Sequence, residues 1–357
     1  MVSKPLKICI VTRRIGTTGK EAVGIGRVSY ELIKGLLSRG HEVASIDSPS
    51  SSLISYFLDS TIGTPFKLPK GYDIYHALGP IESLWLPKGR TVVTFMDMFQ
   101  YGDTSKLGAG QEKWIFNKLG PIFYKFCCEV AYKKAFRLAS ISLETKKDMV
   151  LYLGREAEGT KVIKLGIPEN LEPRYKELGF IVFGYLGVLD KRKRVDLLIE
   201  TFKKVNKNLD VILVIAGRGP EKEKLEALAK EDKRILFYGY IPEVSLSNYY
   251  NSLDFFISPT SMEGYGLPLV EAMACGKPVI VFKDADIPEE IGSKCIKISN
   301  SIKGRVEALE SLCKGEFKKE EYPIEENYKW AKEHSWNKMV EQYLEVYKDI
   351  IDDKRTS

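Results

Sequence analysis

The sequence predicts an α/β protein built from two doubly wound, mostly parallel β-sheets. Short apolar runs alternate with amphipathic stretches along the chain, which is typical of strands that alternate with helices in a parallel sheet. The alternation lapses once, at residues 168–179, and then starts again. The length of 357 residues suits two domains of this kind.

The first half begins with a buried-strand pattern at residues 6–11. Residues 27–39 then carry apolar side chains at helical spacing, and Gly40 is expected to end that helix. The remaining strand candidates of this half are 43–46, 73–77, 91–95, 138–142 and 161–165. We therefore expect a first domain over residues 1–170.

The second half repeats the pattern after the lapse at 168–179. The expected strands are 180–186, 211–216, 235–238, 255–258 and 278–282, and the expected helices are 195–206, 221–230, 245–252 and 268–275. Residues 328–351 are expected to be helical, with one apolar stripe. We expect a second domain over 179–330 and a terminal helix, 336–355, that crosses back to the first domain.

Composition excludes several classes of protein. An apolar fraction of 44% is too high for a disordered chain, and the apolar runs are too short to cross a bilayer. The six cysteines show no Cys-x-x-Cys spacing and there are three histidines, so we expect a reduced, cytoplasmic protein without a metal site. We read the N-terminal apolar run as a strand and not as a signal peptide, because it is too short.

Positive charge is concentrated in the first half. Residues 1–178 carry 26 Lys and Arg against 18 Asp and Glu, a net of +8, whereas the whole chain has +6. Such a bias favours an anionic ligand or peripheral contact with a membrane surface, and an ordinary soluble surface explains it as well. No dense basic stripe or nucleic-acid-binding module is present in the sequence.

The most informative block is residues 258–276, a strand followed by a glycine-rich turn and a helix. Gly264 and Gly266 allow the backbone to approach a ligand, and Pro268 suits the first turn of a helix. Helix N-termini favour anions, phosphates especially. Glu263 and Glu271 flank this turn, and a carboxylate that accepts two hydroxyl hydrogen bonds suits a sugar.

This block resembles the signature of the GT-B-fold retaining glycosyltransferases of family 4, in which two glutamates are separated by seven residues. The resemblance implies two Rossmann-like domains that face a central cleft. It places Glu263 at the transferred sugar and Glu271 on the ribose of the nucleotide. It also assigns Gly264, Tyr265, Gly266 and Leu267 to the donor-binding turn.

A second block, residues 183–199, reads as strand, glycine turn, basic cluster and helix. It resembles the family's Gly-x-Leu-x-x-Arg-Lys-x stretch, which implies that Arg192 and Lys193 bind the donor diphosphate. Some family members instead have arginine directly after the glycine, where this chain has Val188. A solvated basic run before a helix is the alternative.

Two further glycine-bearing strand ends resemble the family. Gly217 lies in one of them, and the other borders the nucleobase by resemblance, so we expect Tyr240 or Ile241 to contact the base. Residues 287–292 match the family's Leu-Pro-Glu loop.

The first domain matches less closely. Gly24 and Gly26 open the first helix where the family has a glycine-rich loop near phosphate and acceptor, although a plain turn would look the same. The family usually has His-Asp after a later strand, and this chain has Met96 and Asp97. We expect Asp97 to be catalytic, and Met96 or His76 to contact sugar or acceptor, with a packing role as the alternative for His76.

Two motifs have a second interpretation. Asp284-Ala285-Asp286 has the spacing of a metal-binding pair, but one so short is weak evidence and Arg192 and Lys193 can neutralise a diphosphate. Residues 114–136 mix aromatic residues with lysines, as in a face that rests on a membrane or accepts a lipid-linked substrate. Ordinary helix packing with a solvated lysine edge is the preferred interpretation.

The resemblance implies a retaining, metal-independent glycosyltransferase. The co-substrate would be a UDP- or GDP-sugar, with no tightly bound cofactor, and the acceptor a sugar, a lipid-linked or a small-molecule hydroxyl. The alternatives are a catalytically weakened sugar-nucleotide-binding protein, which the missing histidine suggests, and a GT-B UDP-sugar epimerase.

Overall fold

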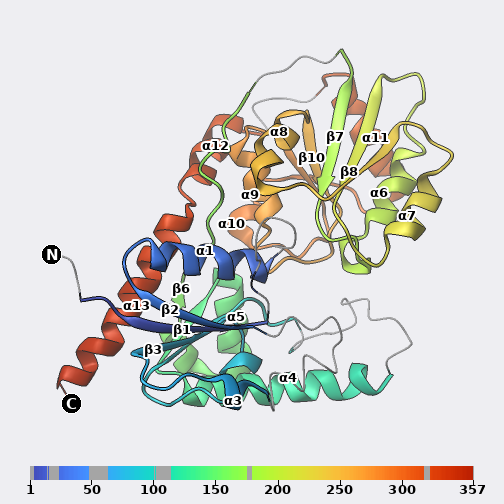
Figure 1. Cartoon of the computed structure of the whole chain (residues 1–357). Coiled ribbons are helices and arrows are strands. Elements are labelled where there is room, and N and C mark those ends of the chain that lie inside the picture. The colour runs from blue at the N-terminus through green and yellow to red at the C-terminus, as the bar shows by residue number, and fades with distance from the viewer. Residues whose placement is uncertain are drawn as a thin grey trace. The chain divides into compact units, whose positions relative to one another are not determined.

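The protein is described by a computed structural model that covers residues 4–13, 15, 24–47, 63–99, 101, 114–174, 179–316 and 322–356. It divides into two compact units (Figure 1). Unit 1 comprises Met1–Gly166 together with Ser335–Ser357, and unit 2 comprises Ile167–His334. The two units are described separately below.

Unit 1 contains a six-stranded sheet in the order β2-β1-β3-β4-β5-β6, with every pair parallel. Its strands are β1 (Lys7–Thr12), β2 (Glu42–Asp47), β3 (Ile74–Ala77), β4 (Thr91–Phe95), β5 (Arg137–Ser140) and β6 (Lys161–Val162). The central strands β3 and β4 are buried along their whole length, as strands covered on both faces must be. The predicted doubly wound architecture is confirmed for this half.

Helices cover both faces of this sheet. They are α1 (Ile25–Leu37), α3 (Thr64–Lys67), α4 (Trp114–Lys134), α5 (Leu143–Leu153) and α13 (Trp336–Thr356), with 3₁₀ turns η2 (Ile81–Ser83) and η5 (Arg155–Gly159). Gly24, at a φ of 58°, precedes α1, and the Ser142 hydroxyl caps α5 by accepting from the Thr145 N–H at 3.1 Å. None of the helices in the described part of the chain is long and apolar enough to cross a membrane.

The expected helix over 328–351 is wrong as a single element. The structure has α12 (Ile324–Lys332), which belongs to unit 2, and then α13, which begins at Trp336 and belongs to unit 1. The Ser335 hydroxyl accepts a hydrogen bond from the Lys338 N–H at 3.1 Å, so a new helix begins there with its own N-cap. The break contains no proline or glycine, so the sequence offers no strong signal for it.

Helix α13 is held to unit 1 by packing and by a buried polar network. Val340 packs against Gly35 of α1, where no side chain would fit. The His76 ring nitrogens lie 2.7 Å from the Tyr347 hydroxyl and 2.8 Å from the Thr94 hydroxyl. These contacts tie the last helix to strands β3 and β4, far away in the sequence.

Unit 2 contains a second six-stranded parallel sheet, in the order β12-β11-β10-β7-β8-β9. Its strands are β7 (Ile181–Leu186), β8 (Val211–Ala216), β9 (Ile235–Gly239), β10 (Phe255–Ser258), β11 (Val279–Phe282) and β12 (Ile296–Ile298). The strand order reverses between β7 and β10, which lie next to each other at the centre. In open parallel sheets, ligands bind beside the carboxyl ends of strands at such a reversal.

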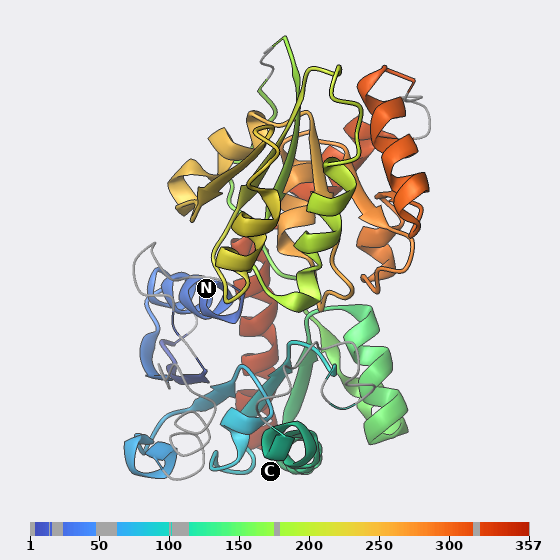
Figure 2. The same cartoon turned by 90° about the vertical axis from the view of Figure 1, so that its right-hand side faces the viewer.

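The helices of unit 2 form two layers. They are α6 (Val195–Phe202), α7 (Lys222–Ala229), α8 (Leu246–Asn251), α9 (Leu267–Ala274), α10 (Glu289–Gly292), α11 (Ile302–Cys313) and α12, with 3₁₀ turns η6 (Lys191–Lys193) and η7 (Glu243–Ser245). Helices α6, α7 and α11 cover one face, and α8, α9 and α12 the other; Figure 2 looks onto the α6 and α7 face. Helix α6 ends earlier than the expected 195–206, because Arg234 donates hydrogen bonds to the Phe202 and Val205 carbonyls and caps this end.

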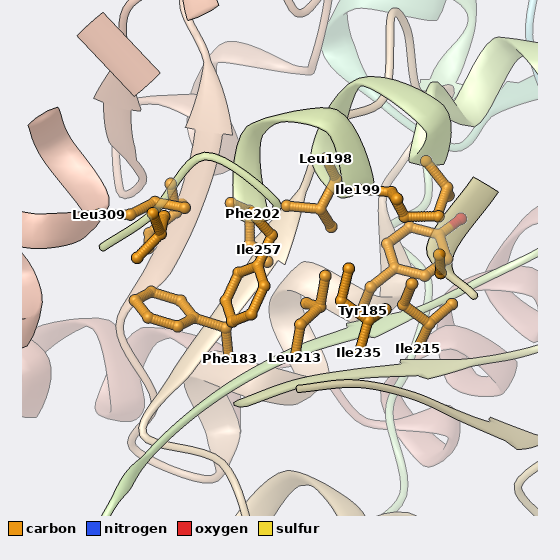
Figure 3. Packing of buried hydrophobic residues seen from close by; sticks show 14 of the residues in the cluster. Phe183, Tyr185, Leu198, Ile199, Phe202, Leu213, Ile215, Ile235, Ile257 and Leu309 are labelled. Atoms are coloured by element: carbon orange, nitrogen blue, oxygen red, sulfur yellow. The ribbon is translucent and has the colours of Figure 1, made fainter. Parts of the chain in front are cut away.

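The core of unit 2 lies between its sheet and helices α6, α7 and α11. Phe183 and Leu213 from the strands meet Leu198 and Phe202 from α6, and Figure 3 shows these side chains interdigitating. All four are buried. The loops that follow these strands carry the candidate site.

Candidate functional site

The candidate site lies at the carboxyl ends of the neighbouring strands β7 and β10. Residues 187–194 follow β7 and residues 259–266 follow β10. Phe183 of β7 is in register with Phe255 of β10, so the two loops leave the sheet side by side. The two blocks singled out in the sequence are therefore brought together by the parallel register.

The loop after β7 is a capped turn that fixes its basic residues. The Asp190 carboxylate accepts a hydrogen bond from the Lys193 N–H at 3.0 Å and so caps η6. Arg194 then adopts the left-handed conformation at a φ of 50° before α6 begins. This geometry directs Arg192 and Lys193 toward the loop after β10.

The carboxylate of Glu263 is held by both of these cations. The Lys193 ammonium donates a hydrogen bond to Oε1, and Nη1 of Arg192 lies 3.7 Å from Oε2. Nη1 of Arg192 also donates to the Met262 carbonyl at 2.7 Å. Arg192, Lys193 and Glu263 together carry a net charge of +1, and the Asp190 carboxylate also acts on Lys193.

This ion pair is largely removed from solvent. The side chains of Lys193 and Glu263 are each 11% exposed. Burial lowers the pKa of Lys193 from its ordinary value, and the charge of Glu263 opposes that shift. A cation in this setting gains more from an anionic partner than it would at the open surface.

Helix α9 begins directly after this loop. Gly266 precedes it at a φ of 99°, a conformation that favours glycine, and Pro268 follows at the start of the helix, where its missing N–H costs little. Tyr265 and Leu267 are buried, and Gly264 is half-buried. The turn thus has the form that the sequence predicts, a glycine-bearing helix start beside Glu263.

Glu271 lies within α9 and is only 1% exposed. Its Oε2 accepts a hydrogen bond of 2.7 Å from the Tyr250 hydroxyl. Tyr250 is fully buried between Tyr249 and Phe256. The ribose-binding role expected of Glu271 stays a prediction, and Tyr250 is a partner that sequence reasoning did not find.

The loops after β8 and β9 lie beside the same edge. Gly217, at a φ of 135°, donates its N–H to the Gly239 carbonyl at 2.6 Å, and a side chain at Gly217 would collide with the Gly187 carbonyl. Tyr240 is half-buried and the Arg218 guanidinium lies 4.9 Å from its ring centre, whereas Ile241 is 5% exposed. Contact of either residue with a nucleobase stays a prediction.

Asp284 and Asp286 both have partners within unit 2. Asp284 accepts two hydrogen bonds from the Arg194 guanidinium, at 2.7 and 2.9 Å, and these bonds lower the pKa of Asp284. The Asp286 backbone pairs with Ser261 and Glu263 at 2.8 Å each. Within the described ranges, no group of three His, Cys, Asp or Glu side chains is arranged to hold a metal ion.

The expected acceptor-side residues all lie in unit 1. Gly24 and Gly26 lie at the start of α1, and Met96 and Asp97, both half-buried, follow β4. The Asp97 carboxylate accepts a hydrogen bond from the Phe99 N–H at 3.3 Å, and its carbonyl accepts one from Tyr124. The catalytic role expected of Asp97 and the contacts expected of Met96 and the glycines stay predictions.

His76 fits the packing alternative better than a ligand contact. The residue is fully buried within β3, and burial lowers its pKa to about 3. Both of its ring nitrogens contact hydroxyl groups in the network described above. A histidine held in this way stabilises the sheet and leaves no ring nitrogen for a substrate.

The helix predicted around residues 114–136 is present as α4. Tyr124 and Cys128 face the core of unit 1, while Ile122 and Phe126 are exposed. The buried side agrees with ordinary packing. Contact of the exposed side with a membrane stays a prediction.

Solved structures share this architecture and define the fold. Sucrose-phosphate synthase from Thermosynechococcus elongatus superimposes with a TM-score of 0.73 at 14% identity, over 98% of this chain and 100% of that one. Anabaena Alr3699/HepE in complex with UDP and glucose gives 0.71 at 18% identity, over 96% and 100%. The fold is the GT-B fold.

The sequence comparison matches unit 2 to a known family. Residues 168–330 match the model of glycosyl transferases group 1. O-antigen chain mannosyltransferase B from Escherichia coli is 28% identical over 172 residues, which are 46% of this chain and 45% of that protein. The chain spans less than half of the length of this protein and of two further curated relatives that it matches.

Proposed function

We propose that this chain is a retaining glycosyltransferase that moves a sugar from a nucleoside diphosphate sugar to an acceptor hydroxyl. The observation that carries the proposal is the convergence of Arg192 and Lys193 on Glu263 beside the start of α9. Two cations and a helix N-terminus favour a diphosphate, and a carboxylate among them can accept sugar hydroxyls. The names of the relatives support the same activity.

In the proposed reaction, the bond between the sugar's anomeric carbon and the β-phosphate oxygen breaks. The acceptor oxygen bonds to that carbon on the same face, and the acceptor proton passes to the departing phosphate. Negative charge grows on the diphosphate, where Arg192 and Lys193 stabilise it electrostatically. No side chain of the protein has to act as a nucleophile.

We also propose that the reaction needs no metal ion. Arg192 and Lys193 supply the positive charge that a divalent cation provides in other transferases. Of the two aspartates with metal-like spacing, Asp284 binds the Arg194 guanidinium through its carboxylate, and the backbone of Asp286 pairs with Ser261 and Glu263. Transfer is therefore expected to proceed at an undiminished rate in excess EDTA.

The names of the relatives suggest which nucleotide sugars to test as donors. One structural neighbour is described in complex with UDP and glucose, and one curated relative is named a mannosyltransferase. UDP- and GDP-sugars are the first donors to test. We propose that unit 1 supplies the acceptor side, with Asp97 as its catalytic group, and that the exposed side of α4 contacts lipid-linked acceptors.

The test is to incubate the purified chain with UDP-, GDP- and ADP-sugars and a panel of hydroxyl acceptors, and to follow products by mass spectrometry. We expect transfer from one nucleotide class, loss of transfer in Glu263→Gln and no effect of EDTA. Interconversion of the free sugar nucleotide without acceptor would instead indicate an epimerase. Nucleotide binding without transfer or donor hydrolysis would indicate a weakened binding protein.

A further inference from the structure

The region behind Glu263 contains an arginine in an unusual conformation. Arg194 is the single non-glycine residue with a positive φ, 50°, in the parts of the chain that the structure describes. L-residues rarely adopt this conformation, because the Cβ atom crowds the backbone. Arginine lacks the short side chain that makes asparagine tolerable there, so the surrounding contacts must hold it in place.

Those contacts all lead to the loops around Glu263. Nε of Arg194 donates to the Pro259 carbonyl and Nη2 to the Thr260 carbonyl, each at 2.8 Å. The same guanidinium forms the two-bond pair with Asp284. One side chain thus joins the loop after β10 to the loop after β11.

The two joined loops also form a short backbone ladder. The Glu263 N–H donates to the Asp286 carbonyl, and the Asp286 N–H donates to the Ser261 carbonyl. On the other side, the Ser261 N–H donates to the Arg192 carbonyl at 3.0 Å. The segment that carries Glu263 is therefore held from both sides, and Arg194 anchors its beginning.

We infer that Arg194 is a positioning residue, which fixes the Glu263 carboxylate opposite Lys193 by clamping the loop after β10 to Asp284. The assignment of Glu263 to catalysis rests on the proposed function, whereas the clamp itself can be tested without it. The Arg194 side chain binds the Pro259 and Thr260 carbonyls, whereas the Lys193 side chain binds Glu263. The two neighbouring cations thereby hold different residues of the loop after β10.

The test compares four single variants and the double variant Arg194→Gly/Asp284→Ala. Arg194→Gly removes the clamp and tolerates the positive φ, Arg194→Ala removes the clamp and strains the backbone, and Asp284→Ala removes one anchor at an exposed position. Arg234→Ala is the matched control, because Arg234 also binds a carboxylate, that of Asp232, and backbone carbonyls, but lies before β9 at the opposite end of the sheet. Hydrogen–deuterium exchange, donor KM and kcat are measured for each.

We expect Arg194→Gly to expose the amides of Ser261, Glu263 and Asp286 to exchange and to lower kcat by about 10- to 100-fold, with a smaller change in KM. Asp284→Ala should act in the same direction, and the double variant should fall short of the summed effects. Arg194→Ala should show the same exchange with a lower melting temperature. Arg234→Ala should lower the melting temperature alone.

Retained protection of residues 261–263 in both Arg194→Gly and Asp284→Ala would overturn the inference. Values of kcat in Arg194→Gly and Asp284→Ala equal to that of Arg234→Ala would also overturn it. If the unaltered protein transfers no sugar, the proposed function fails, and the exchange data still decide whether Arg194 holds the loop.

Discussion

The Glu263 carboxylate is paired with the Lys193 ammonium at the position where the donor diphosphate is proposed to bind. The two side chains are buried together, and Arg192 approaches the same carboxylate from the other side. Glu263 therefore positions the two cations and also competes with the donor diphosphate for binding to them. Several consequences of this relationship can be measured.

Glu263→Gln should abolish transfer and tighten the binding of UDP or GDP. Glutamine keeps the shape of the side chain but removes the charge that competes for Lys193. We expect the Kd of the preferred nucleotide to fall by about tenfold, the scale of one charge-assisted hydrogen bond. Isothermal titration calorimetry checks this, with the exposed Glu231→Gln as control. Unchanged turnover in Glu263→Gln would remove Glu263 from the site.

Lys193→Met should weaken nucleotide binding and also destabilise the fold. The variant leaves Glu263 with Arg192 alone in a largely buried setting, and breaking a buried pair costs about 3 to 5 kcal/mol, less where water still reaches the group. The double variant Lys193→Met/Glu263→Gln should regain much of this stability, because no unpaired charge remains.

Urea unfolding and calorimetry separate these two effects. Lys191→Met serves as the control, because Lys191 lies in the same turn but is exposed. Equal nucleotide affinity in Lys193→Met and Lys191→Met would show that Lys193 does not bind the diphosphate.

Tyr250→Phe should impair the recognition of ribose. The substitution removes the hydroxyl that holds one oxygen of Glu271, so this carboxylate loses its orientation. We expect the Kd of UDP to rise by about fivefold, roughly one hydrogen bond of 1 kcal/mol, while the Kd of 2′-deoxy-UDP hardly changes.

Tyr249→Phe is the matched control, because its hydroxyl bonds to the Tyr185 carbonyl and not to Glu271. The same loss of affinity for both nucleotides in Tyr250→Phe would mean that this tyrosine stabilises α9 without orienting a ribose ligand.

The buried His76 should make unit 1 sensitive to acid. Burial lowers the folded-state pKa to about 3, against an unfolded value of about 6.5, so between these pH values the unfolded chain binds a proton that the folded chain does not. Stability from this residue is therefore fully present above pH 6.5 and falls as the pH decreases toward 3. At pH 5 the loss is about 2 kcal/mol.

Urea unfolding between pH 7 and 5 measures this slope, and His76→Gln should reduce it. Tyr347→Phe keeps the histidine and should retain most of the slope while lowering stability at every pH. A slope in His76→Gln equal to that of the unaltered protein would contradict the role assigned to burial.

Much of the fold could be predicted because its signals are local. The strand Phe255–Ser258 was placed correctly from its apolar run, and the glycine-bearing start of α9 from Gly266 and Pro268. The C-terminal end of α6 and the break before α13 differ from the prediction. Both depend on polar capping contacts, from Arg234 and Ser335, which hydrophobic periodicity does not reveal.

The sequence alone was sufficient for the two doubly wound sheets and for the blocks that contain Glu263, Arg192 and Lys193, because strand periodicity, glycine turns and charge runs are properties of neighbouring residues. Tertiary structure decided the Arg194 clamp on Asp284, the Tyr250 bond to Glu271 and the burial of His76 under α13. These pairs are separated by 90, 21 and, for His76 and Tyr347, 271 residues. They meet only because parallel strands bring distant loops to one edge and the last helix packs on a sheet formed much earlier in the chain.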